Sequence, residues 1–344
     1  MTAKAYIHIG TSKTGTTSIQ RSMAQHAERL REEYSVNYPA TATNHMVLGL
    51  PFLDGQKYLP IENHVLRRQA TADQLTAAAD RLLSGLARDA SRYRTHVLSS
   101  EQLEFLNHDS VSRLKGFFDS IGLPVQIIVY VRHPAERLSP LMSQRVRSGR
   151  FSLRTFSVED EVLPVLKTYV SVFGKDDVII RRFGQRYWTN GRLIDDFTAA
   201  FHGTPIEGMT ELRANESLST PAVLIADRLF DIAPLTSGRR GDESWLYRIA
   251  GPKFLAPRAL VEQAVAASCD CLDYLDTEFG IRFDDVDLSH FPESISTEFP
   301  PETLAALADL LNEQAKALSP IPKTWPPRRR TGLLARVWQR LARA

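Results

Sequence analysis

The sequence has few cysteines, little net charge and no long apolar run, and each of these absences excludes a class of protein. Cys269 and Cys271 are its two cysteines. Two positions apart on a helical segment, they point to different sides and cannot form a zinc site alone. A net charge of +2 gives no overall attraction to nucleic acid. No run of residues approaches the roughly 18 apolar residues that span a membrane.

We expect no export signal at the start of the sequence. Residues 1–4 lead directly into an apolar segment, without the apolar h-region of a signal peptide. The sequence therefore predicts a cytoplasmic protein in which both cysteines are reduced, partly buried thiols. Its hydrophobic content of 43% and charged content of 24% are typical of a globular chain that can bury a core.

Apolar strand segments alternate with helical segments over the first two thirds of the chain. Strands are predicted at residues 6–9, 34–39, 95–101, 125–131 and 178–180. Helices are predicted at residues 18–30, 71–92, 109–121, 134–148, 162–173 and 193–201. Residues 41–66 look irregular and could line a site. The alternation favours an α/β fold of three layers, with a central, mostly parallel sheet.

The last third of the chain is predicted to be helical. Helices are expected at residues 221–232, 258–279 and 302–318. We predict a single domain over residues 1–319, mainly helical from 220 to 319, followed by a Pro-rich linker and a basic amphipathic tail over 320–344. Residues 328–344 are suited to peripheral contact with an anionic membrane surface. Two alternatives are equally compatible with this segment: it packs on the domain, or it is a disordered end of the chain.

Residues 5–20 predict a strand, a loop and a helix that bind phosphate. Gly10 and Gly15 punctuate the loop, whose backbone N–H groups and helix dipole would attract an anion. The two glycines have the spacing of a Walker A loop, but Thr16 stands where that loop requires Lys. Lys13 lies inside the loop instead, beside the expected terminal group of a nucleotide. This arrangement argues against an ATP or GTP hydrolase.

The loop resembles that of a known enzyme family. Lys13, Thr14, Gly15, Thr16, Thr17 and Ser18 follow an apolar strand, as in the 5′-phosphosulfate loop of sulfotransferases that use 3′-phosphoadenosine 5′-phosphosulfate (PAPS). The stretch from His8 to Lys13, with Gln20 behind it, is similar to bacterial members. The resemblance implies a P-loop-like fold, donor binding by these six loop residues, adenosine 3′,5′-bisphosphate (PAP) as a product, and no metal.

The segment from Arg132 to Ser139 resembles the 3′-phosphate segment of the same family, an Arg at a strand end followed by a Ser about two turns into a helix. Arg offers a forked, permanently charged donor to a phosphate. The family's Ser falls eight residues after the Arg, where this chain has Pro140. Either Ser139 or Ser143 replaces it, or Arg132 and Arg137 hold the phosphate. A structural ion pair between Arg132 and a nearby acid is the alternative.

Two residues are candidates for the base that takes the acceptor's proton. Glu101 ends a predicted strand at a position that matches the Ser-Ser-Glu of bacterial relatives, and partial burial there would raise its pKa. His45 lies in the irregular segment and has a suitable intrinsic pKa. A helix-capping carboxylate and a bystander loop His are the structural alternatives. His8 is expected to steady the loop.

The sequence thus predicts a PAPS-dependent sulfotransferase that transfers a sulfuryl group to a hydroxyl, or less readily an amine, of a carbohydrate or small metabolite. It predicts neither a metal nor a nucleic-acid partner. Two alternatives stay open: a P-loop phosphotransferase such as a small-molecule kinase, and a non-catalytic nucleotide-binding or peripheral membrane protein. The sequence identifies neither the acceptor nor the oligomeric state.

Overall fold

The structure is a computed structural model that describes residues 3–39, 43–53, 70–149, 151–212, 217–232 and 244–317. The chain divides into two compact units, Met1–Glu298 and Phe299–Ala344. The second unit contains helix α12 (Pro301–Ala317), which was predicted at residues 302–318. The predicted tail over 320–344 lies outside the described residues. Within the described part of the chain, no helix combines the length and apolar character needed to cross a membrane.

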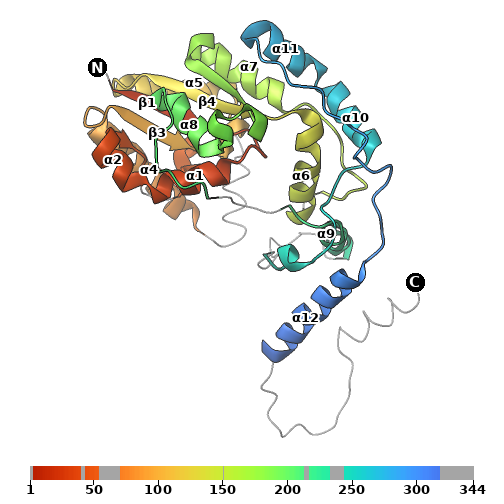
Figure 1. The fold of residues 1–344 in the computed structure, drawn as a ribbon. Helices are drawn as coiled ribbons and strands as arrows, with labels where there is room; N and C mark the ends of the chain where they lie inside the picture. Colours follow the sequence, from red (N-terminus) through yellow and green to blue (C-terminus); the bar gives the residue numbers. More distant parts are fainter. Residues whose placement is uncertain are drawn as a thin grey trace, which may run out of the picture. The chain divides into compact units, whose positions relative to one another are not determined.

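A five-stranded parallel sheet forms the centre of the first unit (Figure 1). Its strands are β1 (Lys4–His8), β2 (Val36–Asn37), β3 (Thr95–Ser99), β4 (Val125–Val131) and β5 (Val178–Arg182). They lie in the order β2-β3-β1-β4-β5, and every neighbouring pair is parallel. Ile7 of β1 pairs with Leu98 on one side and Ile127 on the other. The predicted α/β fold with a parallel sheet is confirmed.

Helices on both faces of the sheet complete three layers. One face carries α1 (Thr16–Gln25), α2 (Ala27–Tyr34) and α8 (Leu193–His202). The other carries α4 (Ala72–Asp89), α5 (His108–Ser120), α7 (Val162–Phe173) and α11 (Cys269–Phe279). Parallel strands need such crossover helices, because consecutive strands must start from the same edge of the sheet.

Several of the remaining elements directly follow the carboxyl ends of the strands. Helix α6 (Pro134–Arg147) starts just after β4 and packs against α9 (Thr220–Ile232) and α10 (Arg258–Ala267). Short 3₁₀ helices form at η1 (Met46–Phe52), η2 (Glu101–Phe105), η3 (Lys175–Asp177), η4 (Gln185–Tyr187), η5 (Thr189–Gly191) and η6 (Ser244–Arg248). The prediction of irregular chain at 41–66 was therefore wrong for residues 46–52.

Two predicted helices are each broken into two. The helix expected at 18–30 ends at Gln25, and the one expected at 258–279 ends at Ala267. His26 and Ser268 depart from helical dihedrals, with φ near −100° and ψ near 10°. The break at His26 is fixed from outside the helix, since its Nε2 accepts a hydrogen bond from the Thr210 N–H at 2.9 Å.

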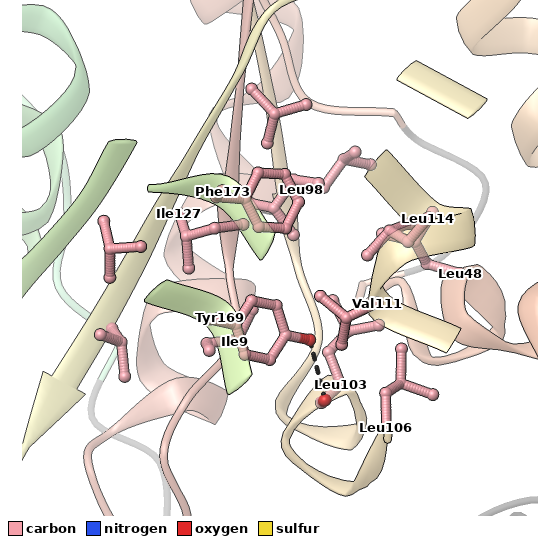
Figure 2. Packing of buried hydrophobic residues seen from close by; sticks show 14 of the residues in the cluster. Ile9, Leu48, Leu98, Leu103, Leu106, Val111, Leu114, Ile127, Tyr169 and Phe173 are labelled. Carbon is pink, nitrogen blue, oxygen red and sulfur yellow. Dashed lines mark hydrogen bonds between the residues drawn. The ribbon is translucent and has the colours of Figure 1, made fainter. Parts of the chain in front are cut away.

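Apolar side chains of β1, β3 and β4 meet α5, α7 and η2 in one core (Figure 2). Leu103 of η2 is fully buried there. Tyr169 of α7 donates a hydrogen bond to the Leu103 carbonyl oxygen at 2.9 Å. This core therefore fixes η2, and with it the two carboxylates that η2 carries, Glu101 and Glu104.

A buried carboxylate joins the opposite helical layer to the sheet. Asp196 of α8 is 1% exposed. It accepts hydrogen bonds from the Tyr130 hydroxyl of β4 at 2.7 Å, the Arg181 Nε of β5 at 3.0 Å and the Thr189 N–H at 3.0 Å. Because a buried charge is unfavourable without partners, these contacts fix α8 against the sheet.

The fold predicts that Asp196→Ala lowers the free energy of unfolding by about 2–4 kcal/mol, because Tyr130 and Arg181 lose their shared acceptor. Glu278→Ala is the matched control. Its pair with Lys175 is half exposed on both sides, and its loss should change stability by less than about 1 kcal/mol. Urea unfolding of both variants measures the difference, and equal effects would contradict an anchoring role for Asp196.

Candidate functional site

The loop between β1 and α1 lies at the carboxyl end of the central strand, where open parallel sheets bind their ligands. Three of its residues take positive φ, namely Gly10 (106°), Lys13 (69°) and Gly15 (75°). A positive φ is uncommon for a residue with a side chain, so Lys13 is held there by its surroundings. The loop is a tight turn that enters α1 through a left-handed residue.

Gly15 has no room for a side chain. A Cβ at this position would lie 2.5 Å from Leu193 Cδ2 and 3.0 Å from Phe183 Cε2. Its φ of 75° is also one that glycine adopts without strain. The end of the loop is therefore packed directly on α8 and on the segment that follows β5.

The first turn of α1 offers unpaired donors to an anion. The first N–H groups of any α-helix have no acceptor within the helix, and the dipole is positive there. Ser18 N–H already bonds the Gly15 carbonyl oxygen at 2.9 Å, whereas the Thr16 and Thr17 N–H groups have no acceptor in the described part of the chain. Thr16 Oγ1 is buried and has no hydrogen-bond partner among the described residues. These are the groups with which helix starts bind phosphate and sulfate.

A cavity of about 580 Å³ opens in front of this helix start, a size typical of small-molecule sites. Gly15, Thr16, Thr17 and Ser18 form one part of its wall. Its charged lining consists of four cations and two acids, which are Lys13, Arg132, Arg147, Lys253, Glu101 and Glu211. The excess of cations around a helix start suits a ligand with several negative charges.

Arg132 reaches the cavity from the end of β4. Its Nη1 donates to the Lys13 carbonyl oxygen at 3.3 Å, and its guanidinium lies 5.1 Å from the centre of the Phe183 ring. Nε lies 3.9 Å from Glu136 Oε2, too far for a hydrogen bond, and it has no partner among the described residues. A buried donor left unpaired costs about 1–3 kcal/mol. An anion in the cavity would supply the missing acceptor.

Lys13 and Glu101 both line the cavity and interact electrostatically. Burial lowers the pKa of Lys13 to about 8, the Glu101 charge opposes this shift, and Arg147 and Arg132 add to it. Burial raises the pKa of Glu101, and the Lys13 charge counteracts this. The structure thus brings together the loop cation and the strand-end carboxylate that the sequence singled out.

His45 is not among the residues that line this cavity. Its Nδ1 accepts from the Ser99 N–H at 3.0 Å, and its Nε2 donates to the Pro39 carbonyl oxygen at 3.1 Å. Burial lowers its pKa to about 4. A neutral ring with both nitrogens engaged does not support the interpretation of His45 as the base. His8 is also buried, and its Nδ1 hydrogen-bonds Ser99 Oγ at 2.8 Å.

Arg137 and Ser139 also have partners away from the cavity. Arg137 donates to the Ser12 carbonyl oxygen at 3.4 Å and to Glu161 at 3.1 Å. The Ser139 hydroxyl accepts from the Ala256 N–H at 2.9 Å. Neither lines the cavity, whereas Ser143 does. Of the arrangements considered for a second phosphate, the structure brings together Arg132 and Ser143.

Thr14 supports the loop from within. Its side chain is fully buried and its hydroxyl donates to the Thr11 carbonyl oxygen. Thr14 is not among the lining residues of the cavity, in contrast to Thr16 and Thr17. The Thr14 hydroxyl therefore stabilises the turn, and a contact between Thr14 and a ligand stays a prediction.

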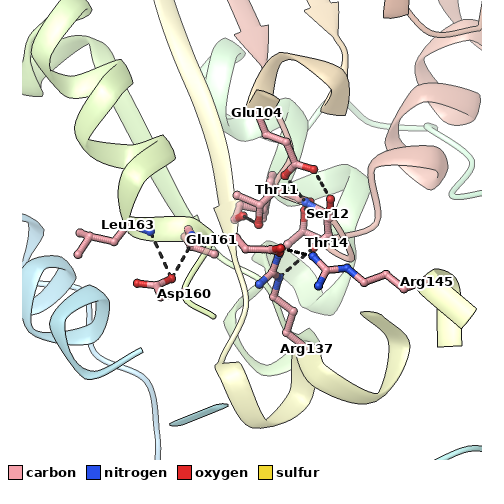
Figure 3. A network of polar contacts seen from close by, with 11 residues as sticks. Thr11, Ser12, Thr14, Glu104, Arg137, Arg145, Asp160, Glu161 and Leu163 are labelled. Carbon is pink, nitrogen blue, oxygen red and sulfur yellow. Dashed lines mark hydrogen bonds and ion pairs between the residues drawn. The ribbon is translucent and has the colours of Figure 1, made fainter. Parts of the chain in front are cut away.

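Glu104 supports the loop between β1 and α1 from η2, a role that was not predicted from the sequence. Its carboxylate accepts hydrogen bonds from the Ser12 N–H at 2.9 Å and from the Ser12 hydroxyl (Figure 3). Burial raises the pKa of Glu104 to about 7, the Ser12 hydrogen bonds oppose the shift, and the Glu101 charge adds to it. The sequence feature that could have indicated this role is the position of Glu104, a second carboxylate three residues after Glu101.

The cysteines lie outside this site. Cys269 is exposed and Cys271 is buried, so they face different sides as the spacing predicted. The prediction that both are partly buried was wrong. Within the described residues, no group of three or more His, Cys, Asp and Glu side chains is arranged to hold a metal ion.

Comparisons with known proteins show a structural likeness. No protein-family model matches the chain, and no curated protein matches it. Among solved structures, the chain is similar to a sulfotransferase from Alicyclobacillus acidocaldarius, with 16% identity, a TM-score of 0.33, and coverage of 92% of this chain and 95% of that chain. A likeness at this level of identity and TM-score does not indicate the function of this chain.

The packing of Gly15 gives a prediction with a matched control. Gly15 and Gly122 both have positive φ, but a Cβ at Gly122 would meet no atom within 4 Å. Gly122→Ala should lower the free energy of unfolding by about 1–2 kcal/mol through backbone strain. Gly15→Ala should lower the free energy of unfolding by about 1–3 kcal/mol more than Gly122→Ala does, because the added methyl group overlaps Leu193 and Phe183. Equal losses in urea unfolding would show that the close contact is absent.

Proposed function

We propose that this chain is a sulfotransferase that transfers a sulfuryl group from PAPS to a hydroxyl group. The observation that carries the proposal is a single cavity that joins the start of α1, Lys13, Arg132 and Glu101. Together these groups supply an anion site, a cation within the loop, a second phosphate contact and a carboxylate base.

The residues present fit a donor with two separate anionic groups. The Thr16 and Thr17 N–H groups and the Lys13 ammonium would hold the 5′-phosphosulfate, because they gather at the positive end of α1. Arg132 and Ser143 would hold the 3′-phosphate. Thr16 Oγ1 and Arg132 Nε, both buried and without partners among the described residues, are the polar atoms that such a donor would satisfy.

Transfer requires a proton acceptor and a charge stabiliser. The acceptor oxygen forms a bond to sulfur while the bond between sulfur and the bridging phosphate oxygen breaks. Glu101 would take the proton of the acceptor hydroxyl, and burial makes its carboxylate a stronger base by raising its pKa. Lys13, largely charged at neutral pH with a pKa of about 8, would stabilise the negative charge on the departing phosphate oxygen.

The acceptor class follows from the same proposal. We infer a hydroxyl, or less readily an amine, on a carbohydrate or small metabolite, as the resemblance of the loop implies. The cytoplasmic location and the membrane contact of residues 328–344 remain predictions from the sequence.

Nucleotide binding tests the proposed donor. Titration calorimetry would compare PAP, adenosine 5′-monophosphate, and ATP with Mg²⁺. We expect PAP to bind most tightly, because the cavity offers a contact for each of its phosphates. Arg132→Ala should weaken PAP binding by about 2 kcal/mol or more and leave the monophosphate nearly unaffected. Arg88→Ala, at an exposed arginine, is the control.

Two outcomes of that titration would count against the proposal. Preference for ATP with Mg²⁺ over PAP would favour a phosphotransferase. Equal weakening of PAP and the monophosphate by Arg132→Ala would show that Arg132 does not read the 3′-phosphate.

Glu101→Gln tests the base. Gln keeps the shape of the side chain but cannot accept the proton, so we expect the transfer rate to fall at least about a hundredfold while PAP affinity stays nearly constant. Glu28→Gln, at an exposed glutamate of α2, is the control. Steady-state kinetics with PAPS and an accepted hydroxyl compound would measure the effect. A Glu101→Gln variant with unchanged turnover would remove Glu101 from the chemistry.

A further inference from the structure

Ser12 is held on two sides within the loop. Glu104 of η2 accepts from its N–H at 2.9 Å and from its hydroxyl, while Arg137 of α6 donates to its carbonyl oxygen at 3.4 Å. Figure 3 shows both side chains meeting the loop, with Arg137 continuing to Glu161 and Arg145. Glu104 itself is positioned by η2, which the buried Leu103 anchors in the core. The conformation of the loop therefore depends on this carboxyl group.

A carboxylate under an anion-binding loop presents an electrostatic conflict. A negative charge at Glu104 would repel the phosphosulfate, and Glu101 on the same helix adds a second like charge. Of the surrounding groups, Arg137 from α6 favours the charged form of Glu104. The Lys13 charge favours the charged form of Glu101. Tyr169 of α7 bonds the Leu103 carbonyl oxygen, and η1, which packs on η2, contains no titratable side chain.

The contacts with Ser12 are compatible with a neutral acid. The Ser12 N–H can donate to one oxygen of Glu104 in either protonation state. A hydroxyl is both a donor and an acceptor, so Ser12 Oγ can donate to a carboxylate or accept from a carboxylic acid. Protonation therefore removes the charge without removing either hydrogen bond. The loop can keep its shape while its electrostatics change.

We propose that Glu104 is a positioning residue that holds the donor loop through Ser12 and takes up a proton from solvent when the anionic donor binds. This inference rests on the proposed function. It makes donor affinity depend on pH in a defined direction. With a pKa of about 7 in the free protein, Glu104 is mostly neutral below pH 7 and ready for the anion. Above pH 7 it is mostly ionised and must be protonated on binding, so affinity falls as pH rises.

Two substitutions separate the charge of Glu104 from its hydrogen bonds. Glu104→Gln is neutral at every pH, and its amide can accept from the Ser12 N–H and donate to Ser12 Oγ. Glu104→Ala removes both contacts. Glu28→Gln serves as the control. Urea unfolding of each variant would verify that it is folded, and PAP is the probe because its binding is measured without catalysis.

Calorimetric titration with PAP at pH 6 and pH 8, in buffers of different ionisation enthalpy, counts the protons taken up on binding. At pH 8 the wild type should take up about one proton more than Glu104→Gln, and its affinity should fall about tenfold more between pH 6 and pH 8. Titration of Lys13 and of the ligand phosphates is common to both proteins and cancels. Glu104→Ala should bind about tenfold more weakly than Glu104→Gln at both pH values, since it no longer holds Ser12.

The outcomes distinguish this inference from the proposed function. Failure of the wild type to bind PAP would overturn the proposed function, and the inference with it. Binding of PAP with equal proton uptake in the wild type and Glu104→Gln would overturn the inference alone. Equal weakening by Glu104→Gln and Glu104→Ala at both pH values would also overturn it, because it would show that the charge is required.

Discussion

The close packing of Gly15 against Leu193 and Phe183 is the constraint on which the rest of the site depends. It fixes the point where α1 begins, and thus the direction in which the first N–H groups face. Asp196 fixes α8, which carries Leu193, to the sheet through Tyr130 and Arg181. Phe183 in turn supports the Arg132 guanidinium at 5.1 Å. The close packing at Gly15 therefore links the start of α1 to the sheet and to Arg132.

Much of the fold could be predicted from the sequence, because strands and helices that bury one face leave a regular apolar pattern. The strand at 125–131 and the helix at 162–173 were predicted with the bounds that the structure shows. The breaks at His26 and Ser268 were missed, because the apolar pattern continues through both positions. The bond between His26 and the Thr210 N–H joins segments far apart in the chain, and no local pattern indicates it.

The site was predictable only where it lies at strand ends. Lys13, Glu101 and Arg132 each follow a parallel strand, and such strand ends meet at the same edge of the sheet. The partners of Arg137 and Ser139 come from distant loops, so their engagement away from the cavity could not be predicted. Lys253 was missed for the same reason, since it reaches the cavity from a segment without a recognisable motif.

The central claim is that the start of α1 and Lys13 bind the 5′-anion of a nucleotide donor. A crystal structure of the chain with PAP tests it most directly. We expect the 5′-phosphate within about 3 Å of the Thr16 and Thr17 nitrogens, with the Lys13 ammonium beside it and the 3′-phosphate on Arg132. A PAP molecule whose 5′-phosphate touches neither α1 nor Lys13 would show that this helix start is not the anion site.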